Sequence, residues 1–222
     1  MKALNAAADA GKILYLGVSD TPAWVVAKAN EHARNNGMRQ FVVYQGQWSA
    51  ASRDFERDII PMVQAEGMAL APWGALGGGN FKSEGQRKAA EGRNMSGFGP
   101  TEAQLKVSKV LEKIAQSKGT LMTSIALAYV MHKTPNVFPI VGGRKVEHLK
   151  GNIEALSLKL SVEEMREIDD ATEFDPGFPH NFLFMGQRFD TNLGPGEVAL
   201  KKMTTHIEAP PKQQPVEPRP LE

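Results

Sequence analysis

Short apolar runs alternate with longer helical patterns along this chain, and this alternation restricts its fold more than any other feature of the sequence. Four of the apolar runs have strand length, and they lie at residues 13–18, 40–45, 67–73 and 136–141. Helical patterns separate them, which predicts an α/β fold with parallel strands joined by crossover helices. A doubly wound sheet and part of a (β/α)8 barrel both fit, since a complete barrel needs eight strands.

The first apolar run, ILYLGV at residues 13–18, predicts a strand that is buried on both faces. Thr21 as a cap and Pro22 as the first helical residue predict the start of a helix directly after it. The inward-facing residues expected for this helix are Val25, Ala29 and His32.

Later helices are predicted from apolar periodicity and from capping signals. A helix is expected over residues 53–66, and another begins at Thr101, which forms a capping-box pattern with Gln104. A third covers residues 124–133, and a fourth follows residue 145. The last expected helix is capped by Ser161 with Glu164. The inward residues expected for these helices are Phe55, Ile59, Met62, Val107, Val110, Leu111, Ile114, Val146, Leu149, Ile153, Leu156, Val162, Met165 and Ile168.

Composition excludes several classes of protein. The 222 residues carry a formal net charge of +1, so there is no overall field to attract nucleic acid. The chain contains no cysteine, which excludes disulfides, thiolate metal sites and cysteine nucleophiles. Its first residues are too polar for a signal peptide, and no apolar run approaches the roughly 20 residues of a membrane span. We therefore expect a cytoplasmic protein without a membrane partner.

Candidate ligand-binding residues lie at the carboxyl ends of the strands, where both architectures bind their ligands. The run at 136–141 ends at Gly142 and Gly143, which let a ligand approach the backbone, and a helix terminus and Arg144 follow. These features predict an anion site, most simply for a phosphate. The alternative is a tight strand-to-helix turn with solvated Arg144 and Lys145.

The other strand ends are less specific. The loop GALGGG at residues 74–79 fits a second phosphate site or a flexible hinge, and Trp73 fits either stacking on a flat ring or core packing. Ser19 and Gln45 could hydrogen-bond an amide or cap the next turn. The histidines lack metal-ligand spacing. The pairs Asp169–Asp170 and Glu163–Glu164 are interpreted as a solvated helix face.

Three segments together resemble the second half of an aldo-keto reductase, most closely the fungal aryl-alcohol dehydrogenase branch. They are GKILYLGVSD, VVYQGQWSAASRDFERDIIPMVQAEGMALAPWGALGGG and PIVGGRKVEHLKGNIEALSLKLS. The similarity runs from about residue 3 to 190, with the motifs in the family's order. It implies that the predicted strands are strands five to eight of a (β/α)8 TIM barrel, and that the cofactor is NADPH.

The resemblance also implies a role for individual residues in binding NADPH. Ser19, Asp20 and Gln45 would hold the nicotinamide amide, and Trp73, in place of the usual tyrosine, would stack on the ring. The loop along the pyrophosphate would contain Gly74, Leu76 and Gly77. Gly143 would allow the cofactor to approach closely and Arg144 would meet the 2′-phosphate, while His148 and Asn152 would face the adenosine end.

The family's catalytic aspartate, tyrosine, lysine and histidine lie on the first four barrel strands, and none can be assigned here. The expected segments are a half-barrel at 1–173, an irregular stretch at 174–208 and a disordered proline-rich tail at 209–222. The implied activity is NADPH-dependent reduction of aryl aldehydes or ketones, or oxidation of aryl alcohols, with this chain inactive alone. The alternative is a non-catalytic NADP-binding or interaction half-barrel, which pairs with itself or with a complementary chain through open strand edges.

Overall fold

The chain forms two compact units in a computed structural model that describes residues 1–88, 99–185, 187–190, 198, 203 and 213–219. The first unit comprises Met1–Gly46, Asp54–Ala71 and Asp175–Gln214, and the second comprises Gln47–Arg53, Pro72–Phe174 and Pro215–Glu222. Parts of two predicted segments lie outside the described residues: the irregular stretch and the proline-rich tail. The division of the chain at residues 173 and 208 stays a prediction.

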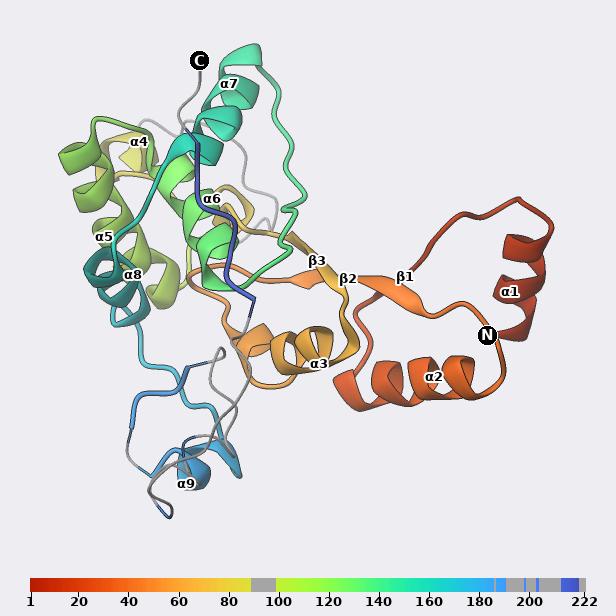
Figure 1. Ribbon diagram of the computed structural model, residues 1–222. Helices are drawn as coiled ribbons and strands as arrows, with labels where there is room; N and C mark the ends of the chain where they lie inside the picture. Colours follow the sequence, from red (N-terminus) through yellow and green to blue (C-terminus); the bar gives the residue numbers. More distant parts are fainter. Residues whose placement is uncertain (89–98, 186, 191–197, 199–202, 204–212, 220–222) are drawn as a thin grey trace. The chain divides into compact units, whose positions relative to one another are not determined.

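Helices and strands alternate as expected up to residue 79 (Figure 1). Their bounds are α1 Lys2–Asp9, β1 Leu16–Ser19, α2 Ala23–Asn35, β2 Phe41–Gln47, η1 Asp54–Glu56, α3 Ile59–Glu66, β3 Ala69–Trp73 and η2 Gly77–Gly79. Helices follow in the rest of the described chain: α4 Glu84–Lys88, α5 Glu102–Lys118, α6 Met122–Lys133, α7 Val146–Glu154, η3 Ala155–Ser157, α8 Val162–Asp169 and α9 His180–Leu183. None of the helices in these described ranges is both long and apolar enough to cross a membrane.

The sheet contains three of the four predicted strands, in the order β1-β2-β3. β1 and β2 are parallel, with Ser19 opposite Gln45. Burial of the first strand on both faces was a wrong prediction, because Leu14 and Tyr15, just before β1, are 73% and 78% exposed. β1 lies at an edge of the described sheet, so one side of this segment has no neighbouring strand there.

The helix faces of the first unit differ from the prediction by small shifts along the chain. α2 begins at Ala23, and its buried residues are Val26, Asn30 and Ala33 rather than the predicted set one position earlier. Asn30 explains the choice of face, since its side chain bonds both the N–H (2.9 Å) and the carbonyl (3.2 Å) of Phe41 in β2. The predicted helix at 53–66 is divided into η1 and α3.

In the second unit, α5 packs against both α6 and α8 (Figure 1). The predicted capping box of Thr101 with Gln104 is confirmed at the start of α5. The box of Ser161 with Glu164 is confirmed at the start of α8. α6 is apolar on all sides and is buried from Ser124 to Val130. These helices provide the core of the second unit.

The fourth predicted strand, at residues 136–141, does not form among the described residues. One backbone hydrogen bond ties it to the end of β3, from the N–H of Ile140 to the carbonyl of Pro72 at 2.8 Å. Pro139 cannot donate to a strand ladder, and the side chains of Phe138 and Ile140 are 63% and 52% exposed. The segment is therefore mainly extended chain, with an isolated β-bridge at Val137 in place of a full strand.

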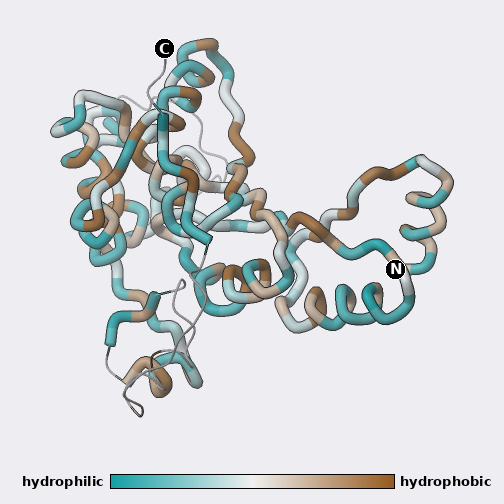
Figure 2. The backbone as a smooth tube through the Cα atoms, viewed as in Figure 1, coloured by the Kyte–Doolittle hydropathy of each residue, from teal (hydrophilic) through white to brown (hydrophobic). Residues whose placement is uncertain are grey.

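α7 forms where predicted, but its apolar stripe is not buried. Hydrophobic and hydrophilic stretches alternate along it, as Figure 2 shows. The four residues expected to face inward are between 45% and 64% exposed: Val146, Leu149, Ile153 and Leu156. Periodicity thus predicted the helix and its apolar face, whereas burial also requires a second surface.

Candidate functional site

Ser19, Asp20 and Gln45 lie together in the first unit, where β1 ends. The N–H of Asp20 donates to the carbonyl of Gln45 at 3.1 Å, and the hydroxyl of Ser19 donates to the Asp20 carboxylate at 3.2 Å. Asp20 has a φ of 46°, a left-handed conformation that short polar residues tolerate better than others. All three side chains are exposed and offer hydroxyl, carboxylate and amide groups.

Tyr44 fixes the turn that follows this group. Its hydroxyl donates to the carbonyl of Thr21 at 2.7 Å and accepts from the N–H of the same residue at 3.0 Å. Burial, together with the charge of Asp20, raises the pKa of Tyr44 above its ordinary value. The ring is 3% exposed. Tyr44 thus has a structural role in holding the turn, because a substrate cannot reach its hydroxyl without displacing the turn.

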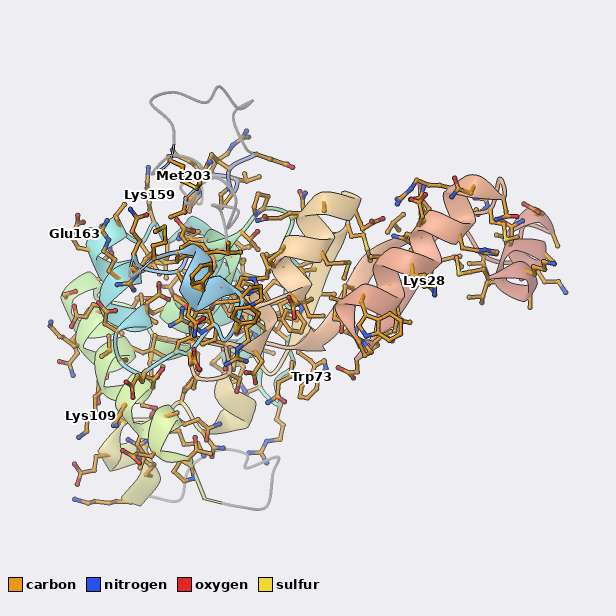
Figure 3. All side chains as sticks on the ribbon, turned by 90° about the horizontal axis from the view of Figure 1, so that it is seen from below. Lys28, Trp73, Lys109, Lys159, Glu163 and Met203 are labelled. Atoms are coloured by element: carbon orange, nitrogen blue, oxygen red, sulfur yellow. The ribbon has the colours of Figure 1, made fainter. Side chains whose placement is uncertain are left out.

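Trp73 and the loop after it belong to the second unit. Trp73 projects from the end of β3 with 39% of its surface exposed (Figure 3), so core packing does not account for this tryptophan. Gly74 and Gly77 have φ values of 77° and 65°, which explains glycine at both positions. The carbonyl of Gly77 accepts a bond from the Gln104 side chain at 3.2 Å, while Leu76 is half-buried.

A second group of the second unit lies where α7 begins. The N–H of Arg144 donates to Nδ1 of His148 at 3.3 Å, which closes the turn onto the first turn of the helix. A β-carbon at Gly143 would lie 2.7 Å from the β-carbon of His148, so the close approach requires glycine there. Within the described part of the chain, the guanidinium of Arg144 forms no ion pair. Asn152 lies two turns further along α7.

The hydrogen bond between Ile140 and Pro72 links the segments that lead to these two groups. Ile140 lies three residues before Gly143, and Pro72 directly precedes Trp73. The structure thus brings together Gly143, Arg144 and His148, and separately Trp73, Gly74 and Gly77. Ser19, Asp20 and Gln45 form a third group in the other unit.

A cavity of about 390 Å³ lies elsewhere in the second unit. It is lined by Gly119, Thr120, Leu121, Glu147, Lys150, Gly151 and Glu154. None of the predicted cofactor-binding residues lines it. The hydroxyl of Thr120 donates to Glu154 at 2.5 Å, so part of its polar lining is already paired.

A buried charge cluster, not predicted from the sequence, surrounds Asp169, and the prediction that this residue lies on a solvated helix face was wrong. The carboxylate accepts hydrogen bonds from the Tyr129 hydroxyl at 2.6 Å and from Nζ of Lys133 at 2.7 Å. Arg53 approaches the same carboxylate at 3.6 Å. Burial raises the pKa of Asp169, but the charges of Lys133 and Arg53, together with the hydrogen bonds from Lys133 and Tyr129, hold the pKa below its ordinary value.

This cluster contains an aspartate, a tyrosine and a lysine, but Tyr129 is fully buried and has no access to a substrate. The spacing of Tyr129 and Lys133, four residues apart on an apolar helix, was the signal that could have located a buried acid beside them. Across the described ranges, no group of three acidic or histidine side chains is arranged to hold a metal ion.

The family model described as the aldo/keto reductase family matches residues 1–173, which is more than half of the chain. The chain belongs to this family. The fungal branch is also supported: norsolorinic acid reductase A of Aspergillus parasiticus is 57% identical over 221 residues, covering 98% of this chain. A probable aryl-alcohol dehydrogenase of Saccharomyces cerevisiae is 52% identical over 190 residues, covering 82% of this chain.

This aldo/keto reductase chain spans about half the length of the relatives that it matches. The matched regions are 56% of the Aspergillus protein and 58% of the yeast protein. A solved structure of a thermostable aldo-keto reductase, bound to the inhibitor epalrestat, matches with a TM-score of 0.57 and 27% identity. The matched region covers 77% of this chain and 53% of the chain in the solved structure. The family's α/β barrel-type fold is therefore the framework for the three strands seen here.

Proposed function

We propose that this chain is the NADPH-binding part of a cytoplasmic oxidoreductase that interconverts aryl alcohols with aryl aldehydes or ketones. The observation that carries the proposal is the turn at Gly143 and Arg144. It combines a tight turn that requires glycine beside His148, a helix N-terminus and an exposed guanidinium without an ion pair in the described chain.

The residues fit the cofactor chemically. Glycine at residue 143 lets the turn pack close to His148, because a β-carbon there would lie 2.7 Å from the β-carbon of His148. A forked, permanently charged donor at Arg144 suits a phosphate monoester such as the 2′-phosphate of NADPH. Trp73 presents a flat face of suitable size for a nicotinamide ring.

The proposed roles follow from these groups and from family membership. Ser19, Asp20 and Gln45 bind the nicotinamide amide and fix the orientation of the ring, and Trp73 covers one face of the ring and excludes water from it. The remaining contacts, to the pyrophosphate and the adenosine end, are assigned to Gly74, Leu76, Gly77, His148 and Asn152. The bound cofactor would supply the hydride that reduces a carbonyl carbon.

We assign no catalytic residue within this chain. Tyr129 and Tyr44 are buried and bound to Asp169 and Thr21, so neither is available as a general acid. The names of the relatives, norsolorinic acid reductase and aryl-alcohol dehydrogenase, support a small carbonyl or aryl substrate. Since the chain spans about half of those proteins, we propose that the acid comes from polypeptide corresponding to their other half.

The activity test is NADPH oxidation with a substituted benzaldehyde, followed at the nicotinamide absorbance. We expect no turnover by the 222 residues alone, because a positioned general acid contributes about 10²–10⁴-fold and the substrate walls are also lacking. Addition of a co-expressed first half taken from a relative should restore activity. Robust turnover by the chain alone would refute the proposal and would implicate an unrecognised acid.

The second candidate function is an interaction half-barrel. It is favoured by exposed apolar residues before β1 in the first unit and, separately, along α7 in the second unit. In this case the chain pairs with another copy of itself or with a complementary chain. NADP binding would then be a structural property rather than part of catalysis.

A further inference from the structure

The segment Gln47–Arg53, here called the brace segment, is tied at its first end to the candidate ring-stacking residue. The N–H of Trp48 donates to the carbonyl of Trp73 at 3.1 Å. Trp48 itself is fully buried. Gln47 also lies close, since its Cγ is 3.7 Å from the β-carbon position of Gly74. The backbone that carries Trp73 is therefore held by the brace segment on one side.

The middle of the brace segment is a closed turn. Ser49 and Ser52 exchange two backbone hydrogen bonds, both of 3.1 Å, and form an antiparallel bridge. The N–H of Ala51 donates to the Ser49 hydroxyl at 3.3 Å. Ser49 is 2% exposed and Ala50 is 1% exposed. Internal bonds and burial make this turn stiff, so a displacement at one end is passed to the other.

The second end is anchored by Arg53 in the buried cluster. Nη1 of Arg53 donates to the backbone carbonyl of Asp169 at 3.0 Å, and Nη2 lies 3.6 Å from its carboxylate. The guanidinium also covers the ring of Phe174 at 4.5 Å. Lys133 bonds both carboxylate oxygens of Asp169 at 2.7 Å, and Tyr129 bonds one of them. Arg53 thus meets a carboxylate that two α6 side chains hold in place.

We propose that Arg53 and Asp169 are positioning residues that hold the Trp73 side chain ready for the nicotinamide ring. They act through the brace segment, from Arg53 to Trp48 and from Trp48 to the carbonyl of Trp73. The inference rests on the proposed cofactor role of Trp73. All of its contacts lie within the second unit, and neither Arg53 nor Asp169 touches the cofactor.

The test uses the full chain with Trp24 replaced by phenylalanine as a common background. In this background, Arg53→Gln, Arg53→Lys and Asp169→Asn are each compared with the otherwise unmutated chain. Trp48 and Trp73 are then the remaining tryptophans, and an added aqueous quencher separates the signal of the 39% exposed Trp73 from that of the fully buried Trp48. Time-resolved anisotropy reports local motion of Trp73, and NADPH titration reports binding. Lys113→Gln is the matched control, because it breaks an ion pair to Glu167 whose partners are 70% and 38% exposed.

We expect Arg53→Gln and Asp169→Asn to increase the fast anisotropy component of Trp73 in the folded protein. NADPH binding should weaken by roughly two- to tenfold, since a mobile side chain must then be ordered on binding. In Arg53→Lys, the Trp73 motion and the NADPH affinity should lie between those of wild type and Arg53→Gln, because lysine keeps the charge but lacks the planar guanidinium with its several donors. The control should behave as wild type.

Unchanged Trp73 motion in Arg53→Gln, with only its urea midpoint lowered, would overturn the inference and leave the cluster a purely structural role. The same anisotropy measurement on Asp169→Asn decides the question if Arg53→Gln does not fold. Absence of NADPH binding by the unmutated chain would instead refute the proposed function. The anisotropy result would still establish whether Arg53 controls Trp73.

Discussion

Asp169 combines burial with charge, and three side chains from two other segments converge on it. Burial disfavours its ionised form, whereas Lys133 and Arg53 favour it more strongly, so its pKa is lower in the folded chain than in an unfolded one. Removing the charge leaves two cations facing each other in a poorly hydrated site. This arrangement makes one carboxylate important for the stability of the second unit.

Asp169→Asn should therefore lower the free energy of unfolding at neutral pH by about 3 kcal/mol, the typical cost of breaking a buried ion pair. The unfolded chain binds a proton at higher pH than the folded one, so the wild-type contribution is present above a pH of about 4 and is lost as the pH falls through the lowered pKa. Urea unfolding at neutral and acidic pH measures both effects.

The difference in the free energy of unfolding between wild type and Asp169→Asn should thus become smaller in acid. Glu167→Gln is the control on the same helix, since its ion pair with Lys113 is exposed and is worth about 0–1 kcal/mol. If the difference in the free energy of unfolding between wild type and Asp169→Asn stayed constant from neutral pH to acid, the lowered pKa of Asp169 would not be a source of stability.

At the scale of elements, the turn between the extended segment at 136–141 and α7 connects the fold to the proposed site. Gly142 and Gly143 are adjacent in sequence but differ in their surroundings. A β-carbon at Gly143 would meet His148 at 2.7 Å, whereas one at Gly142 would have nothing within 4 Å. The two positions therefore provide a matched pair of substitutions.

Gly143→Ala should weaken NADPH binding by roughly tenfold, because the turn must shift and Arg144 moves with it, at the cost of about one charge-assisted contact. Gly142→Ala should bind as wild type. Both variants should keep their urea midpoints, since this turn is exposed and surface changes usually alter stability within about 0.5 kcal/mol. Equal binding by the two variants would argue against a phosphate at this turn.

Local signals were sufficient to predict several elements. Each capping box was predicted because its two bonds lie within four residues, at Thr101 with Gln104 and at Ser161 with Glu164. The inward face of α2 was wrong by one residue, since it depends on the contact of Asn30 with β2. A segment such as 136–141 forms a strand only with a partner strand, which sequence periodicity does not reveal.

Groups of candidate site residues were predictable to the extent that they are adjacent in the chain or paired by strand register. Ser19 opposite Gln45, and Arg144 with His148, follow from parallel pairing and from one helical turn. The cluster around Asp169 was not predictable, because its partners are 36 and 116 residues away in sequence. Distance along the chain, rather than residue type, limited the sequence analysis.

Considered as a whole, the molecule exposes apolar surface that its own described residues do not cover. Leu149 and Ile153 on α7 are 56% and 45% exposed, and Leu14 and Tyr15 are more exposed still. Exposed apolar residues of this kind in each unit favour association. The 222-residue chain is thus expected to self-associate when no complementary chain is present.

Sedimentation velocity should show an average mass that rises with concentration across the micromolar range. A double variant, Leu149→Lys with Ile153→Lys, should reduce this association, because lysine keeps the helix but charges its apolar face. Val162→Lys is the control, since Val162 is a 60% exposed apolar residue on another helix. A compact monomer of unchanged mass at all concentrations would contradict the expectation.

The central claim, that this chain holds the NADPH site, is tested most directly by calorimetric titration with NADPH and with NADH. We predict that the unmutated chain prefers NADPH and that Arg144→Ala reduces the preference about ten- to a hundred-fold, because a charge-assisted contact to the 2′-phosphate is worth roughly 1.5–3 kcal/mol. Lys150→Ala, which removes an equal charge from α7, the helix that follows this turn, should keep the preference. Equal binding of both cofactors by the unmutated chain would contradict the account.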